Sequence, residues 1–353
     1  MTDKWRHMDP FLDVSTAQSI QAIAESVGCF GTYAAEATSE GLGESLPQRF
    51  DAALNYIAHG LDGTANSEPP ATAMSRTNYF RETYAYGEER RVAEVEPFMT
   101  HPQMLEAAKK LSACEEVVPA IVYANLLVPG QELAIHTDVP EFRGVNRKNV
   151  PQWLLVCMLH AGLFDAWRIP ILTCVSWFGV AAGGAFTFYP YGPKRERVAI
   201  AAQHNSAIII DTDRYFHGVE RVGHSSRVAA RDMPDINGQS QLVFIGEDCW
   251  QLRTNGETRR NYTWSDIRYS ISWKGYCFED AHAKECWLSG EDNLSLEQIL
   301  NTLEVELRAR GVLTGDRPDP DAFALMLVQT FIVFPSLADG ASGSDSRAVD
   351  GCK

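Results

Sequence analysis

The chain has 353 residues, of which 45% are hydrophobic and 22% are charged, a composition typical of a globular protein with one or two domains and a sizeable core. Lys and Arg number 31 against 46 Asp and Glu, a net charge of -15 without an evident basic patch, which argues against nucleic acid and anionic membranes as partners. The eight cysteines form no CxxC pair, which disfavours zinc ribbons and disulfide scaffolds and predicts reduced thiols.

The sequence favours neither a secretory signal nor a membrane-spanning helix. The amino terminus, MTDKWRHMDPFLD, lacks a basic segment followed by an apolar run, so it does not have the form of a secretory signal. The apolar run WLLVCML at 153–159 is far shorter than the roughly 20 residues of a membrane helix. We therefore expect a soluble, cytoplasmic protein.

Residues 1–116 are predicted to form a helical N-terminal flank. Apolar residues recur at helical spacing in 19–27 and 48–61, and this periodicity indicates amphipathic helices. Further along, Thr100 is followed three positions later by Gln103, the spacing of a helix capping box.

Residues 117–278 have a different pattern, with short β-rich runs separated by Gly and Pro turns. Runs of this kind with turn punctuation predict an antiparallel sandwich or jelly roll. The runs occupy 120–128, 132–138, 173–180, 185–190, 206–211, 216–222, 241–246 and 268–278.

Helices are expected again in residues 279–335. Ser295 and Gln298 have capping-box spacing, and Asp319 precedes a proline at the start of another apolar-periodic segment, as expected for helix N-termini. The small, polar residues 336–353 are predicted to be disordered. The predicted fold class is therefore α+β, with one β core and flanking N- and C-terminal helices.

The segment PGQELAIHTDVPEF contains a candidate pair of metal ligands. His136 and Asp138 are two positions apart in a β-rich run, so their side chains point to the same face of a strand. A later segment, IIIDTDRYFHGVERV, leads from a buried strand to His217. Two histidines and one carboxylate are the facial triad of non-haem iron(II) oxygenases, which leaves coordination positions open.

The sequence resembles the iron(II)/2-oxoglutarate-dependent oxygenase superfamily over roughly 123–278. The resemblance rests on PGQELAIHTD, AAGGAFTFYP and HGVERV, and on the 79 positions from Asp138 to His217 (217 minus 138). It implies a double-stranded β-helix, or jelly roll, in which iron(II), 2-oxoglutarate and dioxygen oxidise a substrate C-H bond and release succinate and carbon dioxide. Related halogenases lack the carboxylate ligand, so Asp138 favours oxygenation or desaturation.

The resemblance also implies a basic residue that binds the far carboxylate of 2-oxoglutarate, and two arginines compete for this role. Arg227 lies ten positions after His217, a separation common in the family, whereas Arg268 would require an insertion that contains QLVFIGEDCWQL. Arg268, Ser270 and Ser272 share one face of a long β pattern, and an Arg with a nearby hydroxyl is suited to a carboxylate. This local pattern favours Arg268 with Ser270, and Arg227 remains the alternative.

Substrate contacts are predicted in the loop-like segment VPEFRGVNRKNVPQW. Arg143 and Trp153 are candidates for contact with a charged or amphiphilic small molecule, and Arg168 is a further candidate. Tyr123 and Asn125 share a strand face and are candidates for contact with the cosubstrate, although hydrogen bonding within the sheet explains them equally well.

The expected function is the oxidation of an unactivated C-H bond in a small molecule. Hydroxylation, desaturation and oxidative cyclisation, as in the algal kainoid synthases of this superfamily, all remain open. The alternatives are a protein side-chain hydroxylase and a non-catalytic metal-binding jelly-roll protein. His160, His204 and His224 lack a second ligand at strand spacing and are expected to be structural.

Overall fold

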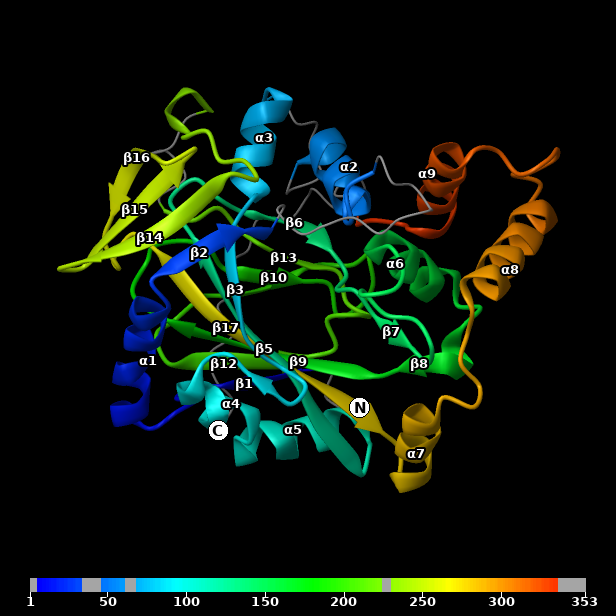
Figure 1. The fold of residues 1–353 in the computed structure, drawn as a ribbon, viewed down its shortest axis with the longest axis horizontal. Helices are drawn as coiled ribbons and strands as arrows, with labels where there is room; N and C mark the ends of the chain where they lie inside the picture. Colours follow the sequence, from blue (N-terminus) through cyan, green and yellow to red (C-terminus); the bar gives the residue numbers. More distant parts are fainter. Residues whose placement is uncertain (1–4, 34–45, 61–67, 224–229, 336–353) are drawn as a thin grey trace.

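The computed structural model describes residues 5–33, 46–60, 68–223 and 230–335. Figure 1 shows antiparallel sheets in the middle of the molecule with helices around them. The predicted disordered segment 336–353 lies outside the described residues, as do Arg227 and His224.

A large antiparallel sheet forms one side of the core. Its central strands, β17 and β5, are paired along almost their whole length, with Ser270 opposite Asn125 and Ser272 opposite Tyr123. In spatial order the sheet consists of β1 (Trp5–Met8), β12 (Ser206–Ile210), β9 (Ile171–Phe178), β17 (Arg268–Phe278), β5 (Glu116–Leu127), β3 (Phe80–Tyr86), β2 (Cys29–Thr32), β14 (Ser240–Gly246), β15 (Cys249–Thr254) and β16 (Glu257–Tyr262), and β4 (Glu89–Arg90) pairs with β3.

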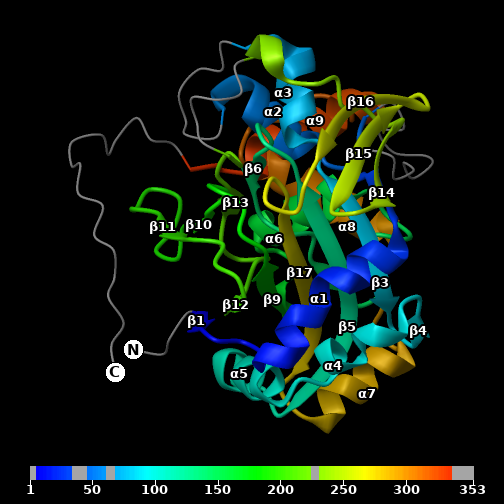
Figure 2. The ribbon, with the colours of Figure 1, turned by 90° about the vertical axis from the view of Figure 1, so that its left-hand side faces the viewer.

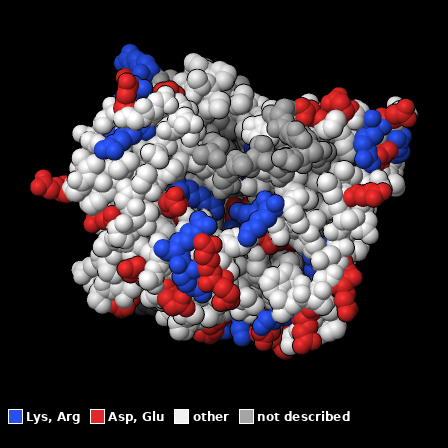
Figure 3. All heavy atoms as spheres, in the orientation of Figure 1, with Lys and Arg blue, Asp and Glu red and all other residues white. Residues whose placement is uncertain are grey.

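A smaller antiparallel sheet lies opposite, and a cavity separates the two. Each run that was predicted to be β-rich contains a strand of one of the two sheets, and the α+β composition is confirmed. The smaller sheet has the order β11 (Val198–Ile200), β10 (Phe186–Phe188), β13 (His217–Val219) and β6 (Leu133–His136), and a separate pair is formed by β7 (Glu141–Phe142) and β8 (Arg168–Ile169). The cavity is visible as a hollow near the middle of the face in Figure 3.

Helices cover the outside of the core in two groups (Figures 1 and 2). The outer face of the large sheet packs against α1 (Val14–Val27), α4 (Glu96–Met99) and α5 (Pro102–Ser112). The remaining helices are α2 (Phe50–His59), α3 (Pro70–Thr77), α6 (Gln152–Ala161), α7 (Ala281–Ser289), α8 (Leu296–Ala309) and α9 (Pro320–Phe331). None of the helices in the described ranges has both the length and the apolar character needed to cross a bilayer.

The two central strands are buried on both faces. Because side chains alternate along a strand, Ile271 and Trp273 of β17 join Val122 and Ala124 of β5 in the core beneath the helices. The residues between them, among them Ser270, line the cavity on the opposite face. One strand therefore contributes both to the apolar core and to the wall of the cavity.

The prediction that residues 1–116 form a helical flank is incomplete, because this region also contributes strands to the large sheet. Strand β3 pairs directly with β5, with Phe80 opposite Leu126, and β2 pairs with β3. In β3, the buried residues Phe80 and Tyr84 mark a weak alternating pattern. Without β3, the edge of β5 would expose a row of unpaired backbone groups, which folded proteins avoid.

An insertion separates β13 from β17, as the prediction of Arg268 rather than Arg227 as the carboxylate-binding residue required. It contains β14, β15 and β16, which form an antiparallel meander, and Leu242 of β14 pairs with Phe30 of β2. The meander therefore extends the large sheet at the edge far from β1, and it leaves β17 free to occupy the centre.

The structure confirms one predicted capping box and not the other. At α8, the backbone N–H of Gln298 donates to Ser295 Oγ at 3.2 Å, and the backbone N–H of Ser295 donates to Gln298 Oε1 at 2.8 Å. The Thr100 prediction is wrong, because α5 begins after His101 with Pro102 at its first position. Proline lacks an N–H and has a fixed φ suited to the first helical turn, so it sets the boundary. The Thr100 hydroxyl instead donates to the Glu96 carbonyl at 3.3 Å.

Replacing Ser295 by Ala should lower the free energy of unfolding by about 1 kcal/mol, the usual loss for an N-cap side chain. Thr100→Ala is the matched control and should change it by less than about 0.5 kcal/mol, as for most surface positions. Urea denaturation of both variants measures the difference. Equal losses would show that the Ser295 cap adds nothing beyond an ordinary surface hydroxyl.

Candidate metal centre

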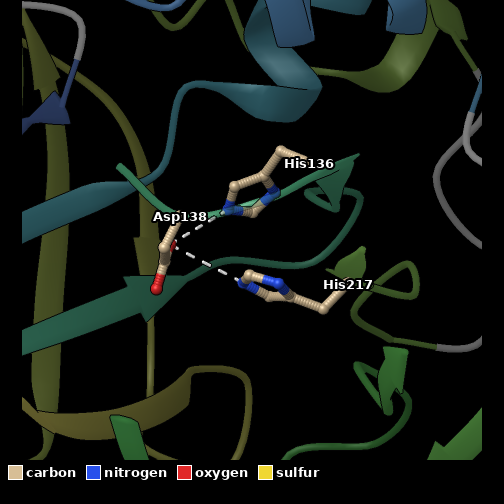
Figure 4. Close-up of side chains that lie close together, drawn as sticks. All are labelled: His136, Asp138 and His217. Carbon is tan, nitrogen blue, oxygen red and sulfur yellow. Dashed lines mark ion pairs between the residues drawn. The ribbon is translucent and has the colours of Figure 1, made fainter. Parts of the chain in front are cut away.

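Three side chains from the smaller sheet and its connecting loop converge at the cavity. His136 ends β6, Asp138 follows two residues later, and His217 begins β13 directly opposite His136 in the strand pairing. One potential ligand atom from each side chain lies within 4.8 Å of the others. Figure 4 shows the two imidazole rings and the carboxylate pointing toward one another. The structure therefore brings together the three residues that the sequence selected.

Backbone hydrogen bonds fix both imidazole rings. His136 Nδ1 lies 2.7 Å from the Ala134 carbonyl oxygen, and His217 Nδ1 lies 3.0 Å from the Tyr215 carbonyl oxygen. A carbonyl oxygen only accepts, so each Nδ1 carries the proton and each Nε2 keeps its lone pair. This arrangement is the common one for metal-binding histidines, whose other nitrogen donates to a fixed acceptor.

The two oxygens of Asp138 have different neighbours. Oδ1 faces His136 Nε2 at 3.5 Å and His217 Nε2 at 3.7 Å. Oδ2 accepts a hydrogen bond from Lys274 Nζ at 2.7 Å, and Lys274 also donates to Thr173 Oγ1 at 3.0 Å. The lysine thereby orients the carboxylate so that Oδ1 is presented beside the imidazoles as a single ligand oxygen.

Burial and neighbouring charges favour the protonation states that a metal requires. Burial opposes ionisation of Asp138, but the Lys274 ammonium holds its pKa well below the usual range. Burial lowers the pKa of His217 to about 3, so this imidazole is neutral at physiological pH. Metal ligation requires a neutral imidazole and an ionised carboxylate, and these two side chains are already in those states.

A second buried carboxyl group, that of Asp213, is close enough to Lys274 and Asp138 to interact with them electrostatically. Both of its oxygens are buried without a hydrogen-bond partner among the described residues. Burial raises the pKa of Asp213 above its usual value, which favours the neutral carboxylic acid. Lys274 is therefore balanced chiefly by Asp138, and sequence reasoning noticed neither Lys274 nor Asp213.

This donor set fits a divalent iron ion. Two neutral imidazole nitrogens and one carboxylate oxygen on one side of the ion are the ligands of non-haem iron(II) sites with open positions. The same three side chains line the cavity between the two sheets, so the open positions would face the space available to small molecules.

The cavity has a volume of about 180 Å³ and receives residues from both sheets and from α2. Besides the triad, β5 and β17 contribute Tyr123, Asn125, Arg268, Ser270, Ser272 and Lys274. The alternation along β17 accounts for its four polar members, because every second side chain faces the cavity. Lys274 extends the predicted Arg268, Ser270 and Ser272 face by one further position, and this signal was available in the sequence.

Arg268 is held in place but keeps an unsatisfied donor. Its Nε donates to the Gly184 carbonyl at 2.6 Å, and its Nη1 lies 3.4 Å from Ser270 Oγ. Its Nη2 is buried without a hydrogen-bond partner in the described part of the chain. Burial lowers the pKa of Arg268 to about 9, which still leaves the guanidinium protonated at neutral pH. A buried cation with an unused N–H group is suited to an anionic ligand.

Gly184 gives Arg268 the space that it needs. A Cβ atom at position 184 would lie 2.5 Å from Arg268 Cδ, and the backbone there has a φ of +65°. Both the close approach and the left-handed conformation favour glycine. Gly184 lies in the AAGGAFTFYP segment, which is part of the family resemblance. The sequence alone assigned no contact to its glycines.

The three residues predicted to contact the substrate lie outside the cavity. Trp153 packs in the core around α6, and Arg143 binds Asp292 with a 2.8 Å hydrogen bond. Neither lines the cavity beside the triad, because the segment 139–153 is not a single loop and α6 turns Trp153 into the core. Arg168 also lies outside this cavity.

Two of the histidines expected to be structural have hydrogen bonds with residues that are not members of the triad. His160 Nε2 lies 3.1 Å from Thr137 Oγ1. His204 Nδ1 accepts from the Gly179 amide at 3.1 Å. Neither belongs to the group of potential ligands found in the described ranges.

No family model and no curated relative matches the chain by sequence. The solved structures with which it aligns include an oxidoreductase of the 2OG-Fe(II) oxygenase family from Burkholderia pseudomallei, with 12% identity and a TM-score of 0.30 over 56% of this chain. That alignment covers 66% of the Burkholderia chain, just under two thirds of its length.

Two further structures align over more of the chain. A prolyl hydroxylase from Trichoplax adhaerens, in complex with a hypoxia inducible factor peptide, has 10% identity and a TM-score of 0.39 over 78% of this chain and 84% of its own. The non-heme alpha ketoglutarate dependent carbocyclase SnoK from nogalamycin biosynthesis also has 10% identity and a TM-score of 0.39, over 83% of this chain and 90% of its own. All three alignments are remote, with identities of 10 to 12% and TM-scores of 0.30 to 0.39.

Substitution of His136, Asp138 or His217 by Ala should each weaken iron(II) binding by at least roughly tenfold, equivalent to about 1.4 kcal/mol, because each removes one of three donors. His160→Ala is the matched control and should bind iron like the wild type. Anaerobic competition with a chromophoric chelator measures the affinities, and circular dichroism checks the fold. Wild-type affinity in His217→Ala would remove His217 from the ligand set and direct attention to His224.

Proposed function

We propose that this chain is an iron(II)/2-oxoglutarate-dependent oxygenase with a double-stranded β-helix core, and that it oxidises a C-H bond of a small molecule. The observation that supports this proposal most directly is the presence of two complementary features in one cavity. The triad presents three donor atoms on the smaller sheet, and Arg268 on the large sheet has a buried N–H without a partner among the described residues.

In this proposal, His136, Asp138 and His217 hold the iron, and Arg268 binds the far carboxylate of 2-oxoglutarate. The Ser270 hydroxyl accepts from Arg268 Nη1 in the present arrangement, so its own proton is available for donation to the same carboxylate. When bound, iron(II) and 2-oxoglutarate supply the oxidation of the substrate by dioxygen, with release of succinate and carbon dioxide.

Other side chains of the cavity orient a metal ligand and limit the access of water. Lys274 fixes the carboxylate of Asp138 through Oδ2, which leaves Oδ1 for the metal. Apolar lining residues such as Val175, Phe186 and Val219 limit the access of water, and a low local dielectric strengthens the interaction of Arg268 with a carboxylate.

The alternative of a closed, structural metal site is less well supported. A structural zinc site normally has four protein ligands, and the cluster found in the described residues has three members. The open side of the cluster faces the cavity, as a site that binds a cosubstrate requires. Hydroxylation, cyclisation and desaturation remain alternative outcomes of the proposed chemistry.

Arg268→Ala should weaken 2-oxoglutarate binding by at least roughly tenfold while iron binding persists. The basis is the loss of a buried charge partner, on the order of 2 to 5 kcal/mol, whereas tenfold needs only about 1.4 kcal/mol. Titration of 2-oxoglutarate into the anaerobic iron complex, followed by the metal-to-ligand absorbance, measures the affinity. Succinate release in air with ascorbate then tests turnover.

The control variants for this titration are Arg143→Ala, whose side chain lies outside the cavity, and Arg227→Ala, the alternative anchor. Both should titrate like the wild type. A loss of binding in Arg227→Ala together with normal binding in Arg268→Ala would assign the anchor to Arg227. Failure of the wild type to form any absorbance band would contradict the proposed function itself.

Gly184→Ala should also reduce 2-oxoglutarate affinity, because the added Cβ would collide with the Arg268 side chain. Gly162→Ala is the matched control, since Gly162 has a similar φ of +68° but no atom within 4 Å of an added Cβ. Both variants should lose stability through backbone strain, by roughly 1–2 kcal/mol, but the affinity should fall in Gly184→Ala alone. The same absorbance titration, combined with urea denaturation, separates the two effects.

A further inference from the structure

A second cavity lies between the end of β17 and α7, and it has a volume of about 350 Å³. This volume is within the range of small-molecule sites. Its walls come from the C-terminal end of α5, from β8 and the residue after it, from the end of β17 and from α7. Figure 1 shows this region at the lower right, where β17 leads into α7. No described residue lines both this cavity and the one beside the triad.

The second cavity is lined by two of the arginines that the sequence indicated for ligand contact, Arg143 and Arg168. They come from neighbouring strands, since Phe142 of β7 pairs with Arg168 of β8. Arg143 is neutralised within the chain, because its Nε and Nη2 donate to Asp292 at 2.8 and 2.7 Å. Its Nη2 also donates to the Ala166 carbonyl at 2.7 Å. Arg143 therefore forms part of the wall, and Arg168 is the cation that a ligand could use.

Arg168 is buried but poorly paired. Its side chain is 5% exposed, and its Nη1 is buried without a hydrogen-bond partner among the residues that the structure describes. Its Nη2 lies 3.6 Å from Asp211 Oδ2, which is longer than an N–H···O hydrogen bond. Asp211 is shared with Arg214, whose Nε lies 3.5 Å from Oδ2 and whose backbone N–H donates to Oδ1 at 3.1 Å. Asp211 therefore compensates Arg168 incompletely.

A second carboxyl group near Arg168 does not complete the pairing. Asp213 is close enough to Arg168 to interact with it electrostatically, but neither of its oxygens accepts a hydrogen bond from the described part of the chain. Burial raises the pKa of Asp213 to about 8, so at neutral pH this group is mainly the uncharged acid. A buried guanidinium with unsatisfied N–H groups is unfavourable. An acceptor supplied by a ligand would remove this penalty.

Much of the remaining lining is apolar and aromatic. Trp287 of α7 packs against Phe278 and Tyr276 of β17, with ring centres 5.2 and 5.3 Å apart. Trp287 and Phe278 line the cavity together with Ile169 and Pro170, and Trp287 is partly exposed. Small-molecule sites combine apolar walls with a few placed polar groups. A matching ligand therefore has a flat apolar part as well as an acceptor for Arg168.

The charges at the cavity favour a singly charged ligand group. Glu279 also lines the cavity and is exposed, and Asp211 lies beside Arg168. These two carboxylates oppose a doubly charged group such as a phosphate monoester more strongly than a single negative charge. A guanidinium binds a carboxylate through two parallel N–H donors, so a carboxylate matches both the charge and the shape of this donor.

We propose that the second cavity binds a small aromatic carboxylate, whose carboxylate group pairs with Arg168 and whose ring packs against Trp287 and Phe278. This inference goes beyond the proposed function and does not depend on it, because none of these three residues lines the cavity beside the triad. The site is therefore separate from the candidate metal centre.

The test uses three probes: 3-phenylpropanoate, the neutral 3-phenylpropanamide, and propanoate, which lacks the ring. Each is titrated by calorimetry into the full chain under anaerobic conditions, with and without iron(II). The affinity for 3-phenylpropanoate should exceed that for each of the other probes by at least about tenfold, a difference of about 1.4 kcal/mol. It should be the same with and without iron(II), because the site does not include the triad.

Arg168→Gln should lower the affinity for 3-phenylpropanoate by at least about tenfold, again about 1.4 kcal/mol, and leave 3-phenylpropanamide unaffected. Trp287→Leu is a second variant that should weaken 3-phenylpropanoate binding by the loss of the aromatic wall, in case Arg168→Gln fails to fold. Arg259→Gln is the matched control, because Arg259 pairs with Glu257 on the meander. Arg268→Gln tests the other cavity. Both of these should bind the probe like the wild type, and circular dichroism checks the fold of every variant.

Equal binding of 3-phenylpropanoate and either other probe, or no binding of 3-phenylpropanoate, would overturn the inference. Wild-type affinity in folded Arg168→Gln would also overturn it. A loss of binding in Arg268→Gln with normal binding in Arg168→Gln would place the probe beside the triad and would likewise contradict a second site. None of these results bears on the oxygenase proposal, which the 2-oxoglutarate absorbance titration tests separately.

Discussion

The structure depends on one central strand that is buried on both faces. Strand β17 is paired with β5 on one edge and with β9 on the other, so its backbone groups are satisfied within the sheet. Its odd-numbered residues Tyr269, Ile271 and Trp273 belong to the apolar core under the helices. This packing fixes the register of the strand, and a shift by one residue would place the core residues in the cavity. Arg268 and Lys274 are therefore held by the same packing that stabilises the fold.

Placement of polar groups on such a strand has an energetic consequence. A buried cation is unfavourable unless it is paired or hydrogen-bonded, and the two cations of β17 meet this requirement in different ways. Lys274 is paired with Asp138, whereas Arg268 has the Gly184 carbonyl and the Ser270 hydroxyl but keeps Nη2 unsatisfied among the described residues. The first arrangement orients a metal ligand, and the second leaves a donor for a bound anion.

The two sheets contribute different parts of the candidate site. The smaller sheet and the loop after β6 supply His136, Asp138 and His217, and both imidazoles are oriented by backbone carbonyls two residues before them. The large sheet supplies Arg268 and Lys274. The pairing of β6 with β13 and the separation of the sheets thus set the metal ligands on one wall of the cavity and the cations of β17 on the other.

The sequence by itself determined the features that depend on local periodicity and spacing. Alternation along 268–278 placed Arg268 and Ser270 on one strand face, and cap residues marked the start of α8. The HTD spacing paired His136 with Asp138, although β6 ends at His136 and Asp138 lies in the loop that follows. The Thr100 cap was mispredicted because Pro102 sets the helix boundary. The weak pattern of β3 was missed because its role is to pair with β5, a long-range contact.

Only the tertiary structure decided which distant residues share the cavity. Arg143 and Trp153 were chosen for their proximity to the ligands in sequence, but one binds Asp292 and the other is turned into the core by α6. Arg49, Arg81 and Arg147 come from three separate segments and still line one cavity with β17, so no basic patch is visible along the chain. Side-chain periodicity is a property of neighbouring residues, whereas the charge of a cavity depends on how remote strands and loops pack together.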